Sequence, residues 1–250
     1  MTEHLGYDDL RVDTVRQVAK LMAAAAITAP KSGGQLFLAG GRNFMETVVV
    51  EDPDERHRIA EWQRARGCER REQIWFRDAD VAEAVDAILF VGLLPEWYPP
   101  NYDCGACGYA TCAEFLHFTK ALRDDSAELE FHGPVCNLRD IDLGIAVGSA
   151  ARTAAIHSID CRCQTRVAVA ARKLGLIQAG HAVALSLSMT HKAIGFDRPC
   201  PTRTSTPLTS RPPGHSRSAC PEQPATAARG TSRHPGSRSA APTPDPTSPS

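Results

Sequence analysis

Four cysteines fall close together in the chain and have the chemistry to bind a metal cluster. They are Cys104, Cys107, Cys112 and Cys136, and their spacing is C-x2-C-x4-C-x23-C. A cubane [4Fe–4S] cluster takes four thiolate ligands, one for each iron. Three ligands from one turn and a fourth from a more distant element suit such a site. The spacing therefore predicts that these four cysteines bind one [4Fe–4S] cluster.

The residues around these cysteines suit an anionic group. Gly105 and Gly108 each follow a predicted ligand, and glycine allows positive φ and a close approach of backbone N–H groups to sulfur. Cys136 comes just before a helix predicted from Asp140, so the positive end of that helix would face the cluster. Pro134 would stiffen the chain that leads into the fourth ligand.

Four cysteines also fit three other kinds of site or setting. A structural zinc site also uses four cysteines, but it usually pairs two short C-x2-C knuckles rather than three ligands and one. Disulfides fit poorly, because the chain has nine cysteines and we expect a cytoplasmic, reducing location. Unligated, buried cysteines pack as small apolar groups, although a glycine-rich turn is an unusual setting for them.

Two further cysteines, Cys161 and Cys163, flank Arg162. On a β-strand, residues two apart lie on the same face, so both thiols could point toward one metal ion. No additional cysteine follows nearby to complete such a site, and the simpler interpretation is a pair of packing thiols. The other three, Cys68, Cys200 and Cys220, stand alone.

A second candidate site lies in the turn Ala29-Pro30-Lys31-Ser32-Gly33-Gly34. Lys31, Ser32 and Gly33 could together form an anion cradle, from an ammonium group and backbone N–H groups, for a flavin phosphate. The stretch is similar to an Ala-Pro-Ser motif of flavin-binding nitroreductases, which implies FMN as a second cofactor. The alternative is an ordinary loop that ends a helix. His157, Asp160 and Asp78 are candidate acid/base residues, but none falls in a recognised catalytic pattern, so the sequence leaves the catalytic residues unknown.

The elements expected around these sites mix helices and strands. Apolar spacing predicts helices over about 9–28, 54–66, 140–157 and 163–174, the third with a small-residue face. Strands are expected over 35–39, 87–93 and 181–188, of which 87–93 is apolar enough to be buried on both faces. The expected fold is therefore an α/β or α+β layered single domain with an embedded cysteine-rich iron–sulfur loop, in a segment of about 85–147.

Composition limits the rest of the chain. Residues 199–250 hold 12 of the 18 prolines and no Phe, Trp or Tyr, which predicts a disordered tail after a folded part of 1–198. The formal net charge of −1 favours neither nucleic acid nor an acidic membrane. The start of the chain lacks the basic and apolar segments of a signal peptide, so we expect a cytoplasmic protein.

Longer motifs extend the comparison beyond the cysteines. The cysteine stretch resembles the small [4Fe–4S] domain of electron-transfer subunits and corrinoid iron–sulfur proteins. Residues 28–34, 140–146 and 196–198 are similar to those of a prokaryotic family of unknown function that contains a ferredoxin domain. The resemblance covers about residues 10–198. It implies Cys104, Cys107, Cys112 and Cys136 as cluster ligands, and it implies no particular reaction.

Three functions follow as hypotheses. The first is an electron-transfer or redox protein whose cluster exchanges electrons with a partner protein or a small electron carrier. The second is a flavin-dependent oxidoreductase with an accessory cluster. The third is a non-enzymatic protein in which a four-cysteine metal site only stabilises the fold.

Overall fold

The core of the protein is a four-stranded antiparallel sheet in the order β1-β2-β4-β3. The computed structural model describes residues 4–33, 43–126, 129–190 and 194–196. The strands are β1 (Met45–Val50), β2 (Ala87–Leu93), β3 (Asp160–Gln164) and β4 (His181–Ser188). In the register, Met45 lies opposite Leu93, Ala87 opposite Leu187, and Asp160 opposite Ser188.

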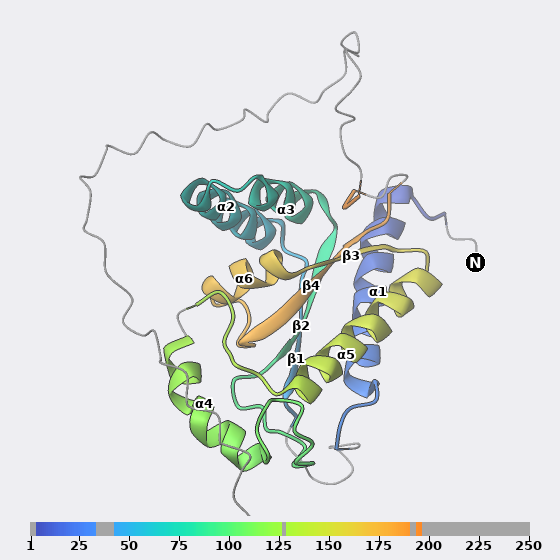
Figure 1. Ribbon diagram of the computed structural model, residues 1–250. Helices are drawn as coiled ribbons and strands as arrows, with labels where there is room; N and C mark the ends of the chain where they lie inside the picture. Colours follow the sequence, from blue (N-terminus) through green and yellow to red (C-terminus); the bar gives the residue numbers. More distant parts are fainter. Residues whose placement is uncertain (1–3, 34–42, 127–128, 191–193, 197–250) are drawn as a thin grey trace, which may run out of the picture. The chain divides into compact units, whose positions relative to one another are not determined.

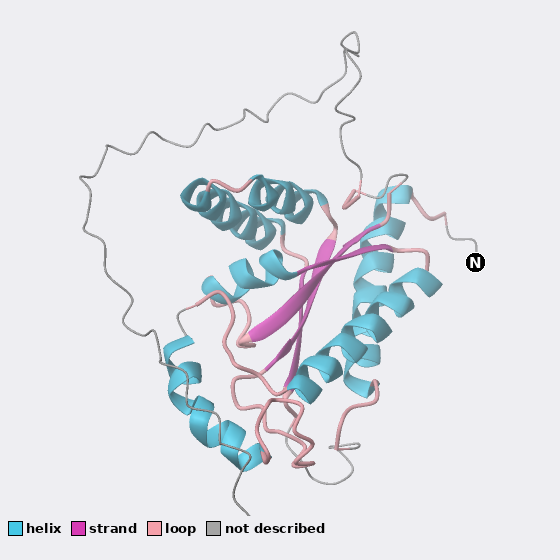
Figure 2. Ribbon diagram, viewed as in Figure 1, coloured by secondary structure: helices cyan, strands magenta, loops and turns pink. Residues whose placement is uncertain are grey.

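Helices cover both faces of the sheet, as Figures 1 and 2 show. On one face, α1 (Tyr7–Thr28) lies against α5 (Asn137–Ile156). The other face is covered by α2 (Pro53–Arg70), α3 (Gln73–Ala84) and α6 (Thr165–Lys173). A sixth helix, α4 (Cys112–Ser126), lies beyond one end of the sheet. The layered α/β domain expected from the sequence is therefore confirmed.

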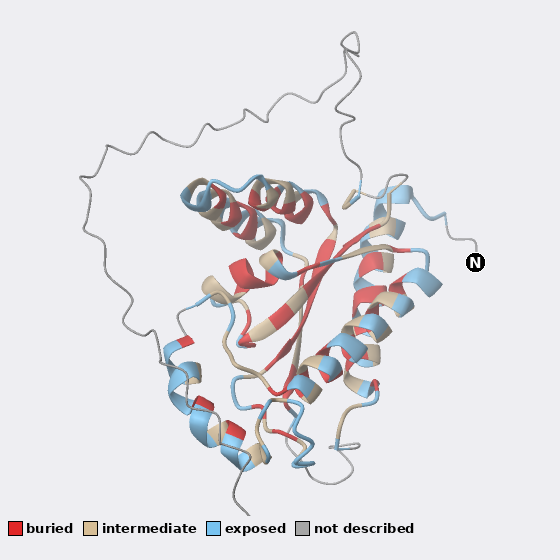
Figure 3. Ribbon diagram, in the orientation of Figure 1, coloured by how far each residue is buried: buried red, intermediate tan, exposed pale blue. Residues whose placement is uncertain are grey.

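Strand β2 is apolar throughout because each of its faces meets a different helix layer. Alternate side chains of a strand point to opposite faces. Leu89 and Val91 belong to the core cluster shared with α1 and α5, whereas Ile88 and Phe90 belong to the cluster shared with α2, α3 and α6. All seven residues of β2 are buried (Figure 3), which confirms the predicted central strand.

The α1–α5 contact rests on the small-residue face predicted for α5. Ala146, Ala150 and Ala154 are fully buried in the core cluster that includes Val18 and Met22 of α1. Small side chains let the two helix backbones approach closely. This close packing holds the start of α5, and therefore Cys136, at one end of the sheet.

Several sequence predictions need correction or fall outside the described residues. Helices α3 and α4 and strand β1 were not predicted, and Cys163 lies in β3 rather than in a helix. Residues 160–164 pair with β4, and because of this tertiary contact the helix begins only at Thr165. The strand expected at 35–39 and the tail at 199–250 lie outside the described residues. No described helix is long and apolar enough to cross a membrane.

Candidate metal centre

The first two candidate ligands lie in a tight loop that follows β2. Gly105 and Gly108 have φ values of +71° and +81°, which confirms the positive φ expected for them. The Gly108 N–H donates to the Gly105 carbonyl at 2.9 Å and closes a turn around Cys107. This turn leaves Cys104 exposed and Cys107 partly buried.

The third candidate, Cys112, is the first residue of α4. Thr111 Oγ1 accepts the Glu114 N–H at 3.2 Å, and Glu114 Oε2 accepts the Thr111 N–H at 3.2 Å. This reciprocal pair is a capping box, which fixes the start of a helix. The carboxylate of Asp103 accepts the Cys112 N–H at 2.7 Å, so the loop and the helix start are joined directly.

The fourth candidate, Cys136, is the N-cap residue of α5 and is only 2% exposed. The next backbone N–H, that of Asn137, donates to Cys107 Sγ at 3.3 Å. The side-chain amide of Asn137 donates to the Ala106 carbonyl through Nδ2. Burial raises the pKa of the Cys136 thiol, and hydrogen bonds from the Arg139 and Leu138 N–H groups partly offset this rise. The start of α5 therefore points one backbone N–H, that of Asn137, at the sulfur of Cys107.

All four cysteines line one pocket. Its other lining residues are Pro99, Pro100, Gly105, Ala106, Tyr109, Thr111, Phe115 and Leu138. Within the described part of the chain, no three Cys, His, Asp or Glu side chains are grouped closely enough to hold a single metal ion. The four thiols thus surround a pocket instead of converging on one point. Four thiols around one pocket, with a backbone N–H donating to one of the sulfurs, fit the donor set that an iron–sulfur cluster requires.

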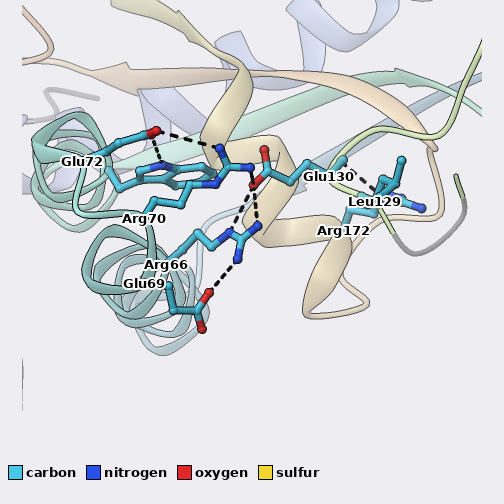
Figure 4. Close-up of polar contacts among 8 residues, drawn as sticks. Arg66, Glu69, Arg70, Glu72, Leu129, Glu130 and Arg172 are labelled. Atoms are coloured by element: carbon cyan, nitrogen blue, oxygen red, sulfur yellow. Dashed lines mark hydrogen bonds and ion pairs between the residues drawn. The ribbon is translucent and has the colours of Figure 1, made fainter. Parts of the chain in front are cut away.

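A strap of residues 129–136 carries Cys136 to this pocket, and side chains of α2 and α6 hold its beginning (Figure 4). Glu130 Oε1 accepts from Arg66 Nε and Nη2 at 3.1 and 3.0 Å and lies 2.6 Å from Arg70 Nη2. Arg172 Nη1 donates to the Leu129 carbonyl at 2.6 Å. One carboxylate oxygen held by two guanidinium groups makes a charge-assisted contact.

The rest of the strap is fixed by α4 and by the residue before β4. The Gly133 N–H donates to Ser126 Oγ at 2.9 Å, and the His132 N–H donates to the Gly180 carbonyl at 2.9 Å. A Cβ atom placed on Gly180 would come within 2.6 Å of His132 Cβ, so only glycine fits this approach. The Gly133–Pro134 peptide bond is cis. The strap is therefore held at two places, residues 129–130 and 132–133, before it reaches Cys136.

A buried ion pair lies one turn after Cys136 and joins three segments. Arg139 and Asp142 are 0% and 1% exposed, and Arg139 Nη1 donates to Asp142 Oδ2 at 2.6 Å. The same guanidinium donates to the carbonyls of Tyr98 and Ser32, and it lies 3.9 Å from the Phe44 ring centroid. Sequence analysis missed this pair. Its only signal was an Arg and an Asp at i, i+3 in a largely apolar helix.

The donors of the predicted anion cradle form hydrogen bonds to other groups of the protein. Lys31 Nζ donates to the carbonyls of Ala26, Ile27 and Ala29 at 2.8–2.9 Å, where it caps the end of α1. Burial lowers the pKa of this ammonium group. The Ser32 N–H donates to Asp142, and the Gly33 N–H donates to the Tyr102 hydroxyl. These contacts match a helix-ending loop, and the FMN site stays a prediction that no contact here supports.

Comparisons with known proteins point to an iron–sulfur cofactor. A family model described as "Putative Fe-S cluster" matches residues 100–129. A second, described as "Uncharacterized protein containing a ferredoxin domain", matches residues 132–198. An uncharacterized protein of Archaeoglobus fulgidus is 35% identical over 194 residues, which are 78% of this chain and 97% of that protein. The chain belongs to the family of uncharacterized proteins containing a ferredoxin domain. Both family models support an iron–sulfur cofactor.

Some solved structures are similar to this member of the ferredoxin-domain family in outline only. NfrA1 of B. megaterium has a TM-score of 0.39 at 10% identity, covering 79% of this chain and 67% of that one. A BluB-like flavoprotein of Clostridium difficile 630 has a TM-score of 0.41 at 11% identity, covering 82% and 88%. Similarity at this level does not indicate a cofactor or a reaction for this protein.

Proposed function

We propose that this ferredoxin-domain protein binds one [4Fe–4S] cluster through Cys104, Cys107, Cys112 and Cys136 and works in electron transfer. One observation carries the proposal: cysteines from the loop, from the start of α4 and from the N-cap of α5 line a single pocket. Bound there, the cluster would accept and release single electrons. The thiols would bind as thiolates, because iron displaces their protons.

The surrounding backbone supports an anionic group in this pocket. Two helices, α4 and α5, begin at the pocket, and the N-terminus of a helix carries a partial positive charge and unpaired N–H groups. The Asn137 N–H already donates to Cys107 Sγ. Hydrogen bonds to the ligand sulfurs stabilise the reduced, more negative state, so the start of α5 would raise the reduction potential.

The exposed side of the pocket suits exchange of electrons with a partner protein. Cys104 is exposed, so one corner of the cluster would lie at the protein surface. Two exposed aromatic residues lie beside it: Tyr102 is 56% exposed, and Phe118, which is 62% exposed, stacks on Tyr109 of the pocket lining. Exposed aromatic side chains are enriched where proteins bind one another. A redox partner protein would contact this rim.

Anaerobic reconstitution with iron and sulfide tests the proposal. We expect about four irons and four sulfides per chain, broad visible absorption, and an EPR signal after one-electron reduction. Cys136→Ser should lose most of the bound iron, because the remaining three cysteines cannot complete the ligand set. Stoichiometric zinc without sulfide, or iron bound equally by wild type and the Cys136→Ser variant, would overturn the assignment.

Cys163→Ser is the matched control, because Cys163 does not line the pocket. This variant should bind wild-type amounts of iron and sulfide. The experiment also separates electron transfer from a purely structural metal site. A structural site would unfold on chelation and would show no reversible reduction by voltammetry.

A further inference from the structure

A second pair of cysteines lies on β3, away from the candidate metal centre. Cys161 and Cys163 are directly opposite Leu187 and Leu185 of β4, and residues opposite each other in an antiparallel pair share a face. Both leucines belong to the core cluster under α1 and α5, so both thiols lie on that face. The two residues are two apart on one strand, so their thiol groups are neighbours on that face.

The pair is separate from the proposed cluster ligands. Neither cysteine lines the pocket that the other four share. In the sheet register, Cys161 is level with Leu187 and Ala87, whereas the cysteine loop follows Leu93 at the other end of β2. Leu93 lies six residue steps along the strand from Ala87, which is roughly 20 Å at about 3.3 Å per residue.

The two thiols differ in their surroundings. Cys163 is exposed, whereas Cys161 is partly buried and packs against the core. The hydrogen bond from Cys161 lowers the pKa of the Cys163 thiol to about 7, and the same bond, together with burial, raises the pKa of Cys161. An exposed thiolate beside a protonated, less accessible thiol is the arrangement in which one cysteine attacks and its neighbour resolves.

We propose that Cys161 and Cys163 form a redox-active dithiol that reacts with small-molecule disulfides. The Cys163 thiolate would attack one sulfur of the substrate, form a mixed disulfide and expel the other half as a thiolate. Cys161 would then lose its proton to that thiolate or to water and attack Cys163 Sγ, which releases the second half. In total, one disulfide is reduced to two thiols, and the Cys161–Cys163 pair loses two electrons and two protons.

The Cys161–Cys163 disulfide would strain β3, and this strain would make the bond easy to reduce again. Residues two apart on a strand have Cα atoms about 6.5 Å apart. Disulfides span about 4.4 to 6.8 Å between Cα atoms and about 3.5 to 4.5 Å between Cβ atoms, so β3 must bend locally to bring the two Cβ atoms together. β3 is an edge strand with one neighbour, β4, in the sheet order, so the strand can adjust to shorten this distance. Disulfides formed near the limit of their geometry are more reducible.

Oxidised glutathione is the probe for this proposal. The reconstituted protein is incubated with it anaerobically, quenched in acid, alkylated and digested with trypsin. Trypsin cuts after Arg162, so the disulfide would join the peptide that ends at Arg162 to the peptide that begins at Cys163. We expect this cross-linked product in the wild type. Cys161→Ser should instead accumulate a glutathione adduct on Cys163.

The Cys163→Ser variant provides the second part of the experiment. In Cys163→Ser, modification of Cys161 should be at least about tenfold slower than modification of Cys163 in Cys161→Ser, because Cys161 is protonated and less accessible. A stable adduct on wild-type Cys163 without the cross-link, equal rates for the two cysteines, or no modification of either would each overturn the proposal. The peptides report on these two cysteines alone, so the outcome does not depend on whether a cluster is bound.

Discussion

The backbone N–H of Asn137 donates to Cys107 Sγ at 3.3 Å, across thirty positions of sequence. This bond joins the start of α5 to the cysteine loop and brings the fourth candidate ligand to the first three. Cys136 can take part only if α5 begins at the right place and in the right direction. The contacts that hold α5 and the strap before it therefore deserve the first experimental tests.

The buried Arg139–Asp142 pair should be needed for stability. Removing one partner leaves an unpaired buried charge, so Arg139→Met and Asp142→Asn should each lower the free energy of unfolding by about 3–5 kcal/mol. Urea unfolding measures this loss. Lys120→Ala is the control, because it breaks the exposed Lys120–Asp124 pair on α4 and should change stability little. Equal effects at the two places would contradict the role given to Arg139.

Glu130 should hold the strap that carries Cys136. Glu130→Gln removes the charge that lies between Arg66 and Arg70, and the expected loss of stability is about 1 kcal/mol, since all three side chains are partly exposed. Amide hydrogen exchange in residues 131–136 should become faster. Glu69→Gln is the control, because Glu69 pairs with Arg66 but does not touch the strap. Unchanged exchange in the Glu130 variant would show that the strap is held by its other contacts.

Replacing each of two glycines with alanine should change the stability of the protein in opposite directions. Gly180→Ala should destabilise the protein, because the new Cβ would meet His132 Cβ at 2.6 Å and push the strap away. Gly148→Ala in α5 has open space around it and should stabilise the helix by about 0.5–1 kcal/mol. Thermal unfolding of both variants beside the wild type checks the pair. A stabilised Gly180→Ala variant would mean that the strap does not pack against Gly180.

Alkylation of Cys163 should depend on pH with a midpoint of about 7, the pKa to which the hydrogen bond from Cys161 lowers its thiol. The thiolate is the reactive form, so the rate of reaction with iodoacetamide should fall as the pH drops through this value. In Cys161→Ala the hydrogen bond is absent, and the midpoint should move up toward the value of a free cysteine, about 8.5. An unchanged midpoint would show that Cys161 does not set the reactivity of Cys163.

Much of this protein follows from local sequence patterns. The cysteine spacing and its two glycines indicated the loop, and the positive φ values of Gly105 and Gly108 confirm that interpretation. Helix α1 and strands β2 and β4 lie where apolar periodicity placed them, as does the small-residue face of α5. These features depend on residues close in sequence, whose side chains meet through the repeat of one helix or strand.

Only the tertiary structure decided how those parts combine. It placed Cys136 beside Cys107 through the packing of α5 on α1, and it paired Cys163 with β4 where a helix had been expected. In the folded protein the Lys31 ammonium group donates to the carbonyls at the end of α1 and not to an open anion site. Each outcome depends on contacts between distant segments, and the energies of such contacts outweigh local preferences that are worth about 1 kcal/mol or less per residue.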